Sequence, residues 1–158
     1  MKKLLTILMF IPILLFGQLE KNNVYAEAHV GIISQVVMNY ERQIYSGEKV
    51  SWYGRLGGGY VVDYIEGLFN DKLGWGGLAA ISLLTGENNN HFELNAGAFM
   101  GFDKDVNIDS DWNKTYTFER FISPIFNVGY RYQKPEGGFI FRANAGLISL
   151  GISFGYAF

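Results

Sequence analysis

Six charged residues recur where a β-strand would place them on one side of a sheet, and they are the first candidates for chemistry in this sequence. They are Glu27, Glu41, Arg55, Glu93, Arg131 and Arg142. Carboxylates and guanidinium groups are stable away from water only when they are paired and hydrogen-bonded. A set with balanced signs could relay charge, line a pore or form a structural core of salt bridges. The elements that carry these residues decide between the three roles.

Nucleophilic catalysis needs a hydroxyl or thiol, a base and an orienting group within hydrogen-bond reach of one another. The chain has no Cys and two His. Glu27, His29 and Ser34 are close in sequence and could form a Ser–His–Glu set, but the hydroxyl and the imidazole fall on either side of a tight hairpin. His91 begins another segment, far from these candidates. The sequence therefore predicts no enzymatic activity.

Two further motifs resemble ligand-binding loops only in part. The glycines at 57–59 have the wrong spacing for a phosphate-binding loop, and no helix follows them. Acidic and amide residues alternate over 103–111 as at the start of a calcium loop, but the required Gly is missing and Lys114 stands where a bidentate Glu is needed. We therefore predict no cofactor and no metal site. A weak surface cation site, or a divalent-ion bridge to lipopolysaccharide phosphates, stays open for 103–111.

The last stretch of the sequence is the one around which the other elements are organised. Large apolar residues alternate there with small or weakly polar ones, which indicates a β-strand because successive side chains point to opposite faces. The large residues are Leu150, Ile152, Phe154, Tyr156 and Phe158. A strand that is apolar toward lipid and small toward an interior, with an aromatic end, is typical of the closing strand of an outer-membrane barrel.

Composition supports an all-β chain that is exported. The 158 residues include 16% aromatics, 20 Gly and a net charge of -2, so the sequence predicts no nucleic-acid partner. Lys2 and Lys3 precede an apolar run that ends at Gly17, which predicts a signal peptide over 1–17 and a mature barrel over 18–158. The apolar run is shorter than the ~20 residues of a spanning helix.

Alternation predicts eight strands, and their connections alternate between short and long. The predicted strands are 24–30, 35–45, 50–62, 75–84, 91–102, 118–132, 139–145 and 150–158. Compact turns are expected at 46–49, 85–90 and 133–138, and long polar loops at 63–74 and 103–117. Pro124 predicts a bulge or a strand start. This pattern predicts an all-β, eight-stranded antiparallel up-and-down transmembrane β-barrel.

In such a barrel the six charges face the lumen, where side chains fill the narrow interior. We therefore interpret them as a salt-bridge core that closes the lumen. Trp52 and Trp75 lie near opposite ends of their strands, so they predict aromatic girdles at the two membrane interfaces.

Several segments together resemble a family of small outer-membrane β-barrel proteins of the Bacteroidota, and the architecture is similar to the membrane domains of OmpA-type proteins. The segments are Asn39-Tyr40-Glu41-Arg42, Arg55-x-Gly57-x-Gly59-Tyr60, His91-x-Glu93-x-x-x-Gly97, Gly129-Tyr130-Arg131-Tyr132-Gln133, Gly138-Phe139-x-Phe141-Arg142-Ala143 and Gly151-x-Ser153-x-Gly155-Tyr156-x-Phe158. The resemblance implies a location in the outer membrane of a Gram-negative cell and no particular activity.

The expected partners follow from that location: outer-membrane lipid, lipopolysaccharide and the barrel-assembly machinery, with a surface partner through 63–74 and 103–117. The expected role is structural or adhesin-like. Two alternatives stay open at this stage. One is a soluble exported barrel of lipocalin type, which needs an apolar interior and a polar exterior. The other is an outer-membrane enzyme that modifies lipid.

Overall fold

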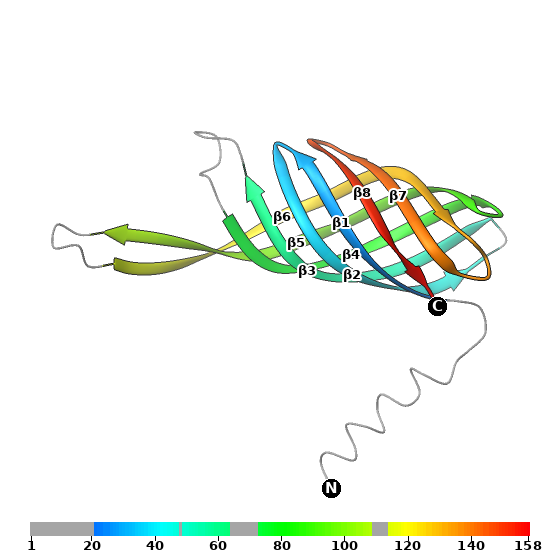
Figure 1. Cartoon of the computed structure of the whole chain (residues 1–158), viewed down its shortest axis with the longest axis horizontal. Coiled ribbons are helices and arrows are strands. Elements are labelled where there is room, and N and C mark those ends of the chain that lie inside the picture. Colours follow the sequence, from blue (N-terminus) through cyan, green and yellow to red (C-terminus); the bar gives the residue numbers. More distant parts are fainter. Residues whose placement is uncertain (1–20, 48, 64–72, 109–113) are drawn as a thin grey trace, which may run out of the picture.

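The computed structural model describes residues 21–47, 49–63, 73–108 and 114–158, and there eight antiparallel strands close into a barrel (Figure 1). This confirms the predicted fold class. The strands are β1 (Asn22–Gly31), β2 (Ile33–Ser46), β3 (Val50–Asp63), β4 (Leu73–Glu87), β5 (Asn90–Ile108), β6 (Lys114–Gln133), β7 (Gly138–Gly146) and β8 (Ser149–Ala157). No helix within the described ranges is long and apolar enough to cross a membrane. The predicted signal peptide over 1–17 lies outside the described residues.

β8 closes the ring by pairing with β1 as well as with β7. Val24 lies opposite Tyr156 and Ala28 opposite Ile152. Two backbone hydrogen bonds continue the ladder at its end, from the Asn22 amide to the Phe158 carbonyl (3.0 Å) and from the Phe158 amide to the Asn22 carbonyl (2.8 Å). A closed ring leaves no free edge along this seam, which is the condition for a sheet to lie in lipid.

The two faces of the sheet are as the alternation predicts. The large residues of the closing strand are all exposed on the outer face: Leu150, Ile152, Phe154, Tyr156 and Phe158. On the inner face Ser153 is fully buried. The exterior is therefore apolar and the interior holds the charges, which is the reverse of what a lipocalin needs.

The interior is filled in two layers. The charged layer consists of the six predicted residues, Glu27, Glu41, Arg55, Glu93, Arg131 and Arg142, all buried. The apolar layer consists of Val37, Val61, Leu78, Ala80, Phe99 and Ile125, with Phe121 packed against it. On β2, Val37 precedes Glu41 and so lies nearer to the β1–β2 turn. On β6, Ile125 likewise precedes Arg131. On these strands the apolar residues therefore lie nearer to the β1–β2 turn than the charges do. The two layers adjoin elsewhere, because Glu27 lies opposite Val37 and Arg55 opposite Ala80.

The predicted long loop over 103–117 is wrong. β5 continues to Ile108 and β6 begins at Lys114, and the two strands pair from Asp103 opposite Glu119 up to Ile108 opposite Lys114. β4 stops pairing with β5 at Asp103. This hairpin therefore leaves the barrel as a two-stranded ribbon (Figure 1). The loop was expected from the many charged and amide residues of this stretch, although Val106, Ile108, Tyr116 and Phe118 alternate with polar residues as in a strand.

The turn predicted over 85–90 is shorter than expected. Glu87 pairs with Asn90, so only Asn88 and Asn89 lie between the strands. Asn88 has φ of 58°, a left-handed conformation that Asn tolerates in two-residue hairpins. Of the loop predicted over 63–74, Asp63 and Leu73 belong to strands, and 64–72 lie outside the described residues.

The bulge predicted at Pro124 is also wrong. β6 runs through Pro124, which pairs with Ala98 in unbroken register. β7 pairs with β6 only up to Asn127 opposite Gly146, so β6 has one strand partner at Pro124. An irregularity lies instead between Gln43 and Tyr45 on β2. A bulge reverses the alternation locally, and both Ile44 and Tyr45 are exposed there.

Candidate functional site

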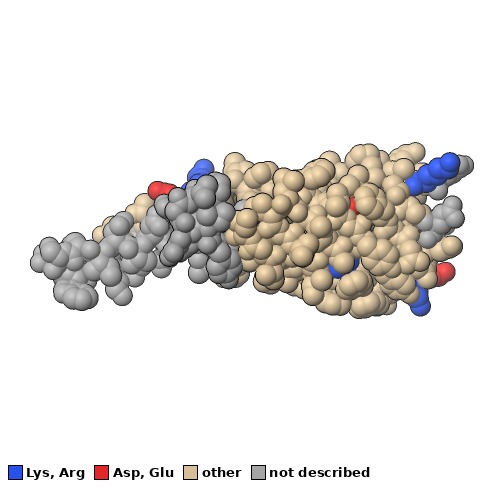
Figure 2. Space-filling model, turned by 90° about the horizontal axis from the view of Figure 1, so that it is seen from above, with Lys and Arg blue, Asp and Glu red and all other residues tan. Residues whose placement is uncertain are grey.

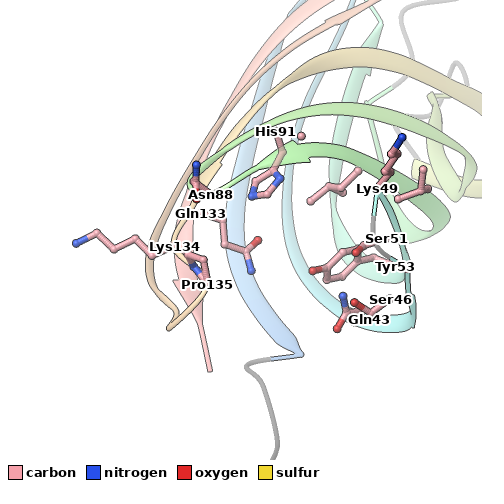
Figure 3. A pocket seen from close by; sticks show the side chains of 14 residues that line it. Gln43, Ser46, Lys49, Ser51, Tyr53, Asn88, His91, Gln133, Lys134 and Pro135 are labelled. Carbon is pink, nitrogen blue, oxygen red and sulfur yellow. The ribbon is translucent and has the colours of Figure 1, made fainter.

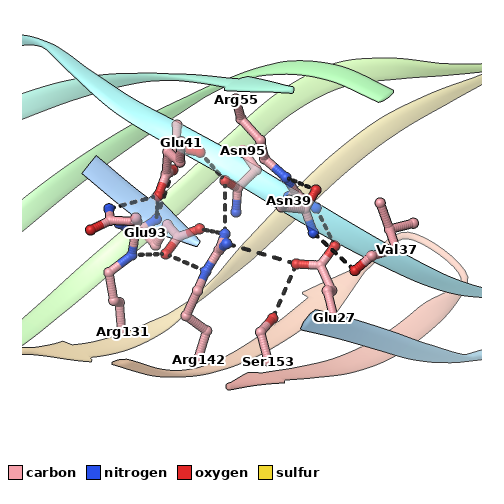
Figure 4. A network of polar contacts seen from close by, with 12 residues as sticks. Glu27, Val37, Asn39, Glu41, Arg55, Glu93, Asn95, Arg131, Arg142 and Ser153 are labelled. Atoms are coloured by element: carbon pink, nitrogen blue, oxygen red, sulfur yellow. Dashed lines mark hydrogen bonds and ion pairs between the residues drawn. The ribbon is translucent and has the colours of Figure 1, made fainter. Parts of the chain in front are cut away.

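The charged layer is the most developed polar site of the described chain. Its members come from β1, β2, β3, β5, β6 and β7, and none is more than 1% exposed. Figure 4 shows the side chains converging on the barrel axis from opposite walls. Alternation on every strand places them inside because each occupies an inward position of its pleat.

Glu93 is the centre of one half of this layer. Arg131 donates from Nε to Glu93 Oε2 at 2.7 Å, and Arg142 donates from Nε to the same oxygen at 3.0 Å. Arg142 Nη2 also contacts the other oxygen of Glu93. Arg131 reaches across to Glu41 at 2.9 Å, so one guanidinium joins carboxylates from β2 and β5.

Glu27 is the centre of the other half. It accepts from Arg55 Nη2 and, at 3.1 Å, from the Ser153 hydroxyl. Arg142 Nη1 lies 3.8 Å from Glu27 Oε2 and joins the two halves. Arg55 also donates to the Asn39 side-chain oxygen at 3.0 Å. Six charges thus form one network with balanced signs.

Two tyrosine rings stack against the guanidinium groups of this network. Arg142 lies 4.3 Å and Arg55 5.4 Å from the Tyr25 ring centroid, and Arg131 lies 5.3 Å from that of Tyr53. Such contacts stabilise a cation that is withdrawn from water. Both tyrosines occupy inward positions, so their side of the strand could be read from the sequence, but their stacking role could not.

This arrangement can seal the lumen. Buried ion pairs are tolerated only when their hydrogen bonds are nearly complete, and here each carboxylate has a guanidinium partner. The apolar layer fills the next level with packed side chains. That layer was missed in the sequence because the strand over 75–84 is apolar on both faces and gives no sign of which face is inside.

The two predicted girdle residues lie on the outer face, as the alternation requires. Trp52 is 41% and Trp75 55% exposed. Trp52 pairs with Tyr45 beside the β2–β3 turn. Trp75 pairs with Phe102 near the other end of the barrel, with ring centroids 5.5 Å apart. The indoles are therefore at opposite ends of the outer surface.

The structure does not bring Ser34 and His29 together as the sequence suggested. The Ser34 hydroxyl bonds to the backbone of Gly31, not to His29. His29 instead lies between Glu27, 3.3 Å from its Nε2, and Ser149, 3.3 Å from its Nδ1. Ser149 was missed because only barrel closure brings it beside β1.

A small pocket of about 170 Å³ opens at the end that carries the β2–β3, β4–β5 and β6–β7 turns (Figure 3). It is lined by polar side chains that include Gln43, Tyr53, His91 and Gln133. Its volume is below the ~300 Å³ of typical ligand sites. His91 therefore lies at the opposite end of the lumen from the β1–β2 and β7–β8 turns.

No cation site can be assigned to the acidic segment over 103–111, because its side chains lie outside the described residues. Elsewhere in the described chain, no group of three or more acidic or histidine side chains is arranged to hold a metal ion.

Comparison with solved structures finds proteins with a similar fold. No family model and no curated protein matches the sequence. The N-terminal β-barrel domain of OprF from Pseudomonas aeruginosa is similar with a TM-score of 0.56 and 14% identity, over 89% of this chain and 100% of that one. Ail, the attachment invasion locus protein of Yersinia pestis, is similar with a TM-score of 0.51 and 8% identity, over 87% of this chain and 96% of that one.

Sequence identities of 14% and 8% support a similarity of fold and no similarity of function. They confirm the predicted similarity to the membrane barrels of OmpA-type proteins at that level. A Bacteroidota source stays a prediction. The chain is thus an eight-stranded barrel of the outer-membrane type.

Proposed function

We propose that the mature chain spans the outer membrane of a Gram-negative cell as a sealed barrel and presents the β5–β6 hairpin for contact at the cell surface. The outer face supports the location. Figure 2 shows a flank of the barrel with almost no charged residues. The charged residues seen in this view lie mostly toward the ends of the molecule. The backbone of a closed barrel satisfies its own hydrogen bonds, so such a flank is compatible with hydrocarbon.

The sealed lumen argues against transport through the barrel. The charged and apolar layers fill successive levels of the interior, and an eight-stranded barrel is only wide enough for side chains. We expect no passage of small sugars when the refolded protein is placed in liposomes. Swelling of these liposomes in an isosmotic sugar solution would contradict a sealed barrel.

The single observation that carries the surface role is the ribbon formed by the hairpin beyond Asp103. β5 from Lys104 to Ile108 pairs with β6 alone. β6 continues above its last β7 pair, at Asn127, to Lys114. Both outer edges of the ribbon thus lack a strand partner among the described strands. Exposed strand edges recruit extended segments of other proteins by adding a strand.

The hairpin role can be tested by removing the ribbon. Because Asp103 pairs with Glu119, a variant in which Asn-Gly replaces residues 104–118 keeps the register. We expect the variant to fractionate with the outer membrane and to show the same heat-dependent gel shift. Cells that express it should lose adherence relative to cells that express the full chain. Equal adherence of the two strains would refute the surface role without affecting the membrane location.

A further inference from the structure

The barrel wall is lowest at β7 and β8, which have 9 residues each, against 19 and 20 in β5 and β6. A 9-residue strand is about 30 Å long, or roughly 23 Å along the axis of a barrel whose strands tilt by ~40°. This is slightly less than the apolar band of an outer-membrane barrel, which is about 25 Å tall. In the proposed membrane location, the β7–β8 turn therefore lies near the outer boundary of the hydrocarbon.

The short wall leaves a notch beside β6. We use this name for the β6 edge over 121–126, which has no β7 partner, together with the adjoining segment from Gly146 to Ser149. β7 pairs with β6 only as far as Asn127 opposite Gly146, so no described strand covers the β6 edge above this pair. The turn itself is apolar, with Leu147 85% exposed. Exposed Val30 and Ile32 extend the apolar rim along the β1–β2 turn.

A serine, a histidine and a glutamate lie in line on the inner face of β1 and β8, close to the β7–β8 turn. The Ser149 hydroxyl is 3.3 Å from His29 Nδ1, and His29 Nε2 is 3.3 Å from Glu27 Oε1. Arg55 and Ser153 hold Glu27 in place. Nε2 is buried and lies within ion-pair distance of Glu27, but it makes no hydrogen bond of good geometry. With its proton on Nε2, the ring accepts from Ser149 at Nδ1.

The position of the imidazole is fixed by the sheet. His29 is 2% exposed and pairs with Gly151, and a Cβ at Gly151 would lie 2.4 Å from His29 Nε2. Only Gly therefore leaves room for the ring on this wall. Ser149 pairs with Gly31 on the same two strands, one inward position above Gly151.

Two buried amides on the neighbouring strands β6 and β7 have side-chain atoms without a hydrogen bond. The Nδ2 of Asn127, and both Nδ2 and Oδ1 of Asn144, are buried without a hydrogen bond. A Cβ at Gly146 would lie 3.1 Å from Ser149 Oγ and 2.6 Å from Asn127 Oδ1, so the bare glycine separates the hydroxyl from this amide by a small gap.

We propose that Ser149, His29 and Glu27 are the nucleophile, the base and the orienting carboxylate of a hydrolase for acyl esters of membrane lipids, which enter through the notch. This inference rests on the proposed membrane location. The notch and its apolar rim lie where the ester linkages of an outer-leaflet lipid meet the boundary between headgroups and hydrocarbon. Acyl chains can then stay in the bilayer while the carbonyl reaches the serine.

The reaction has two steps and needs only water as co-reactant. Ser149 Oγ attacks the ester carbonyl carbon and gives its proton to His29 Nδ1, which produces a tetrahedral intermediate. The tetrahedral intermediate breaks its bond to the lipid alcohol, which takes the proton from His29. Water then attacks the acyl-serine with His29 again as base. A fatty acid leaves and the serine hydroxyl is restored.

The test uses the mature chain refolded in detergent and an alkyl fluorophosphonate, which reacts with an activated serine. We expect labelling at Ser149, confirmed by peptide mass. Ser149→Ala should abolish labelling, and His29→Gln should slow it by about 10²- to 10⁴-fold, the usual contribution of a general base. Ser34→Ala is the matched control, because this rim hydroxyl contacts the Gly31 backbone instead. It should label within twofold of the parent chain.

Two substrates distinguish the sources of the ester. Phosphatidylethanolamine vesicles and purified lipopolysaccharide are incubated separately with the folded protein, and released fatty acids are identified by mass. Release from either one, absent in Ser149→Ala, supports the proposal and names the lipid. A heat-dependent gel shift shows that each variant is folded. If the folded parent chain in the membrane fraction neither labels nor releases acid, the hydrolase inference is overturned and the membrane location stands. If the chain fractionates as soluble, the location itself fails.

Discussion

The charged layer and the apolar layer fill the same lumen by opposite means. In the apolar layer, Phe99 and Leu78 occupy space, and what matters is their volume. In the charged layer, Glu93 is fixed by two guanidiniums from neighbouring strands, and what matters is that every partner is present. The first layer should tolerate a small change of shape, and the second should not tolerate the loss of a single charge.

The layers also differ in what they specify. Ion pairs that cross the lumen, such as Arg131 to Glu41, join strands far apart in sequence and are satisfied in one strand register only. A slip of one residue would turn these charges toward the outer face. The charged layer thus opposes wrong registers, whereas hydrophobic packing in the apolar layer discriminates less strongly between them.

The largest effect should come from Glu93→Gln, which changes almost no volume. It leaves Arg131 and Arg142 short of their shared carboxylate. Loss of one partner from a buried ion pair costs about 3–5 kcal/mol. Urea unfolding in lipid vesicles should show this loss of stability. A loss of less than ~1 kcal/mol would mean that the charged network contributes little to stability. The proposed difference between the charged and apolar layers would then be wrong.

The next largest effect should come from placing an arginine on the other face of the same wall. Met38 lies on β2 beside Asn39 but points outward and is exposed. Met38→Arg should cost about 2–4 kcal/mol in vesicles, the range for a cation near the bilayer midplane. Met38→Leu is the control and should unfold like the parent chain. An arginine that costs nothing here would mean that this face does not meet hydrocarbon, contrary to the proposed location.

The faces of the strands could be read from the sequence because side chains alternate with a period of two. Glu41 and Arg142 are inside and Phe154 is outside, as that period requires. Alternation fails where both faces are alike. Over 75–84 both faces are apolar or glycine, so the sequence does not predict which face holds Leu78 and Ala80, and the structure shows them inside.

Two other features depend on neighbours that are distant in sequence. Among the described strands, the two strands of the ribbon beyond Asp103 pair only with each other and are joined by the backbone ladder. Ser149 meets His29 only because β8 pairs with β1 at the seam, and the two residues are 120 positions apart. The sequence suggested Ser34 for the same role because nearness along the chain was the available guide.

A small effect should follow a matched change in the apolar layer. Ile125 belongs to this layer, and Ile125→Val removes one methylene without adding a polar group. Such changes cost about 0.5–1.5 kcal/mol. The same unfolding measurement allows direct comparison with Glu93→Gln, which removes a charge and almost no volume. If Ile125→Val costs as much as Glu93→Gln, volume and not charge pairing governs both layers.

The smallest effect should come from the ribbon, which neither layer supports. Thr117 lies on β6 in the ribbon, opposite Asp105, and is exposed. Thr117→Lys should change the free energy of unfolding by less than ~0.5 kcal/mol, as for most surface substitutions. The substitution should affect the surface role of the ribbon more than the stability of the barrel. An added lysine on a strand edge opposes pairing with another strand. Reduced adherence with an unchanged unfolding midpoint would therefore separate the function of the ribbon from the stability of the sealed barrel below it.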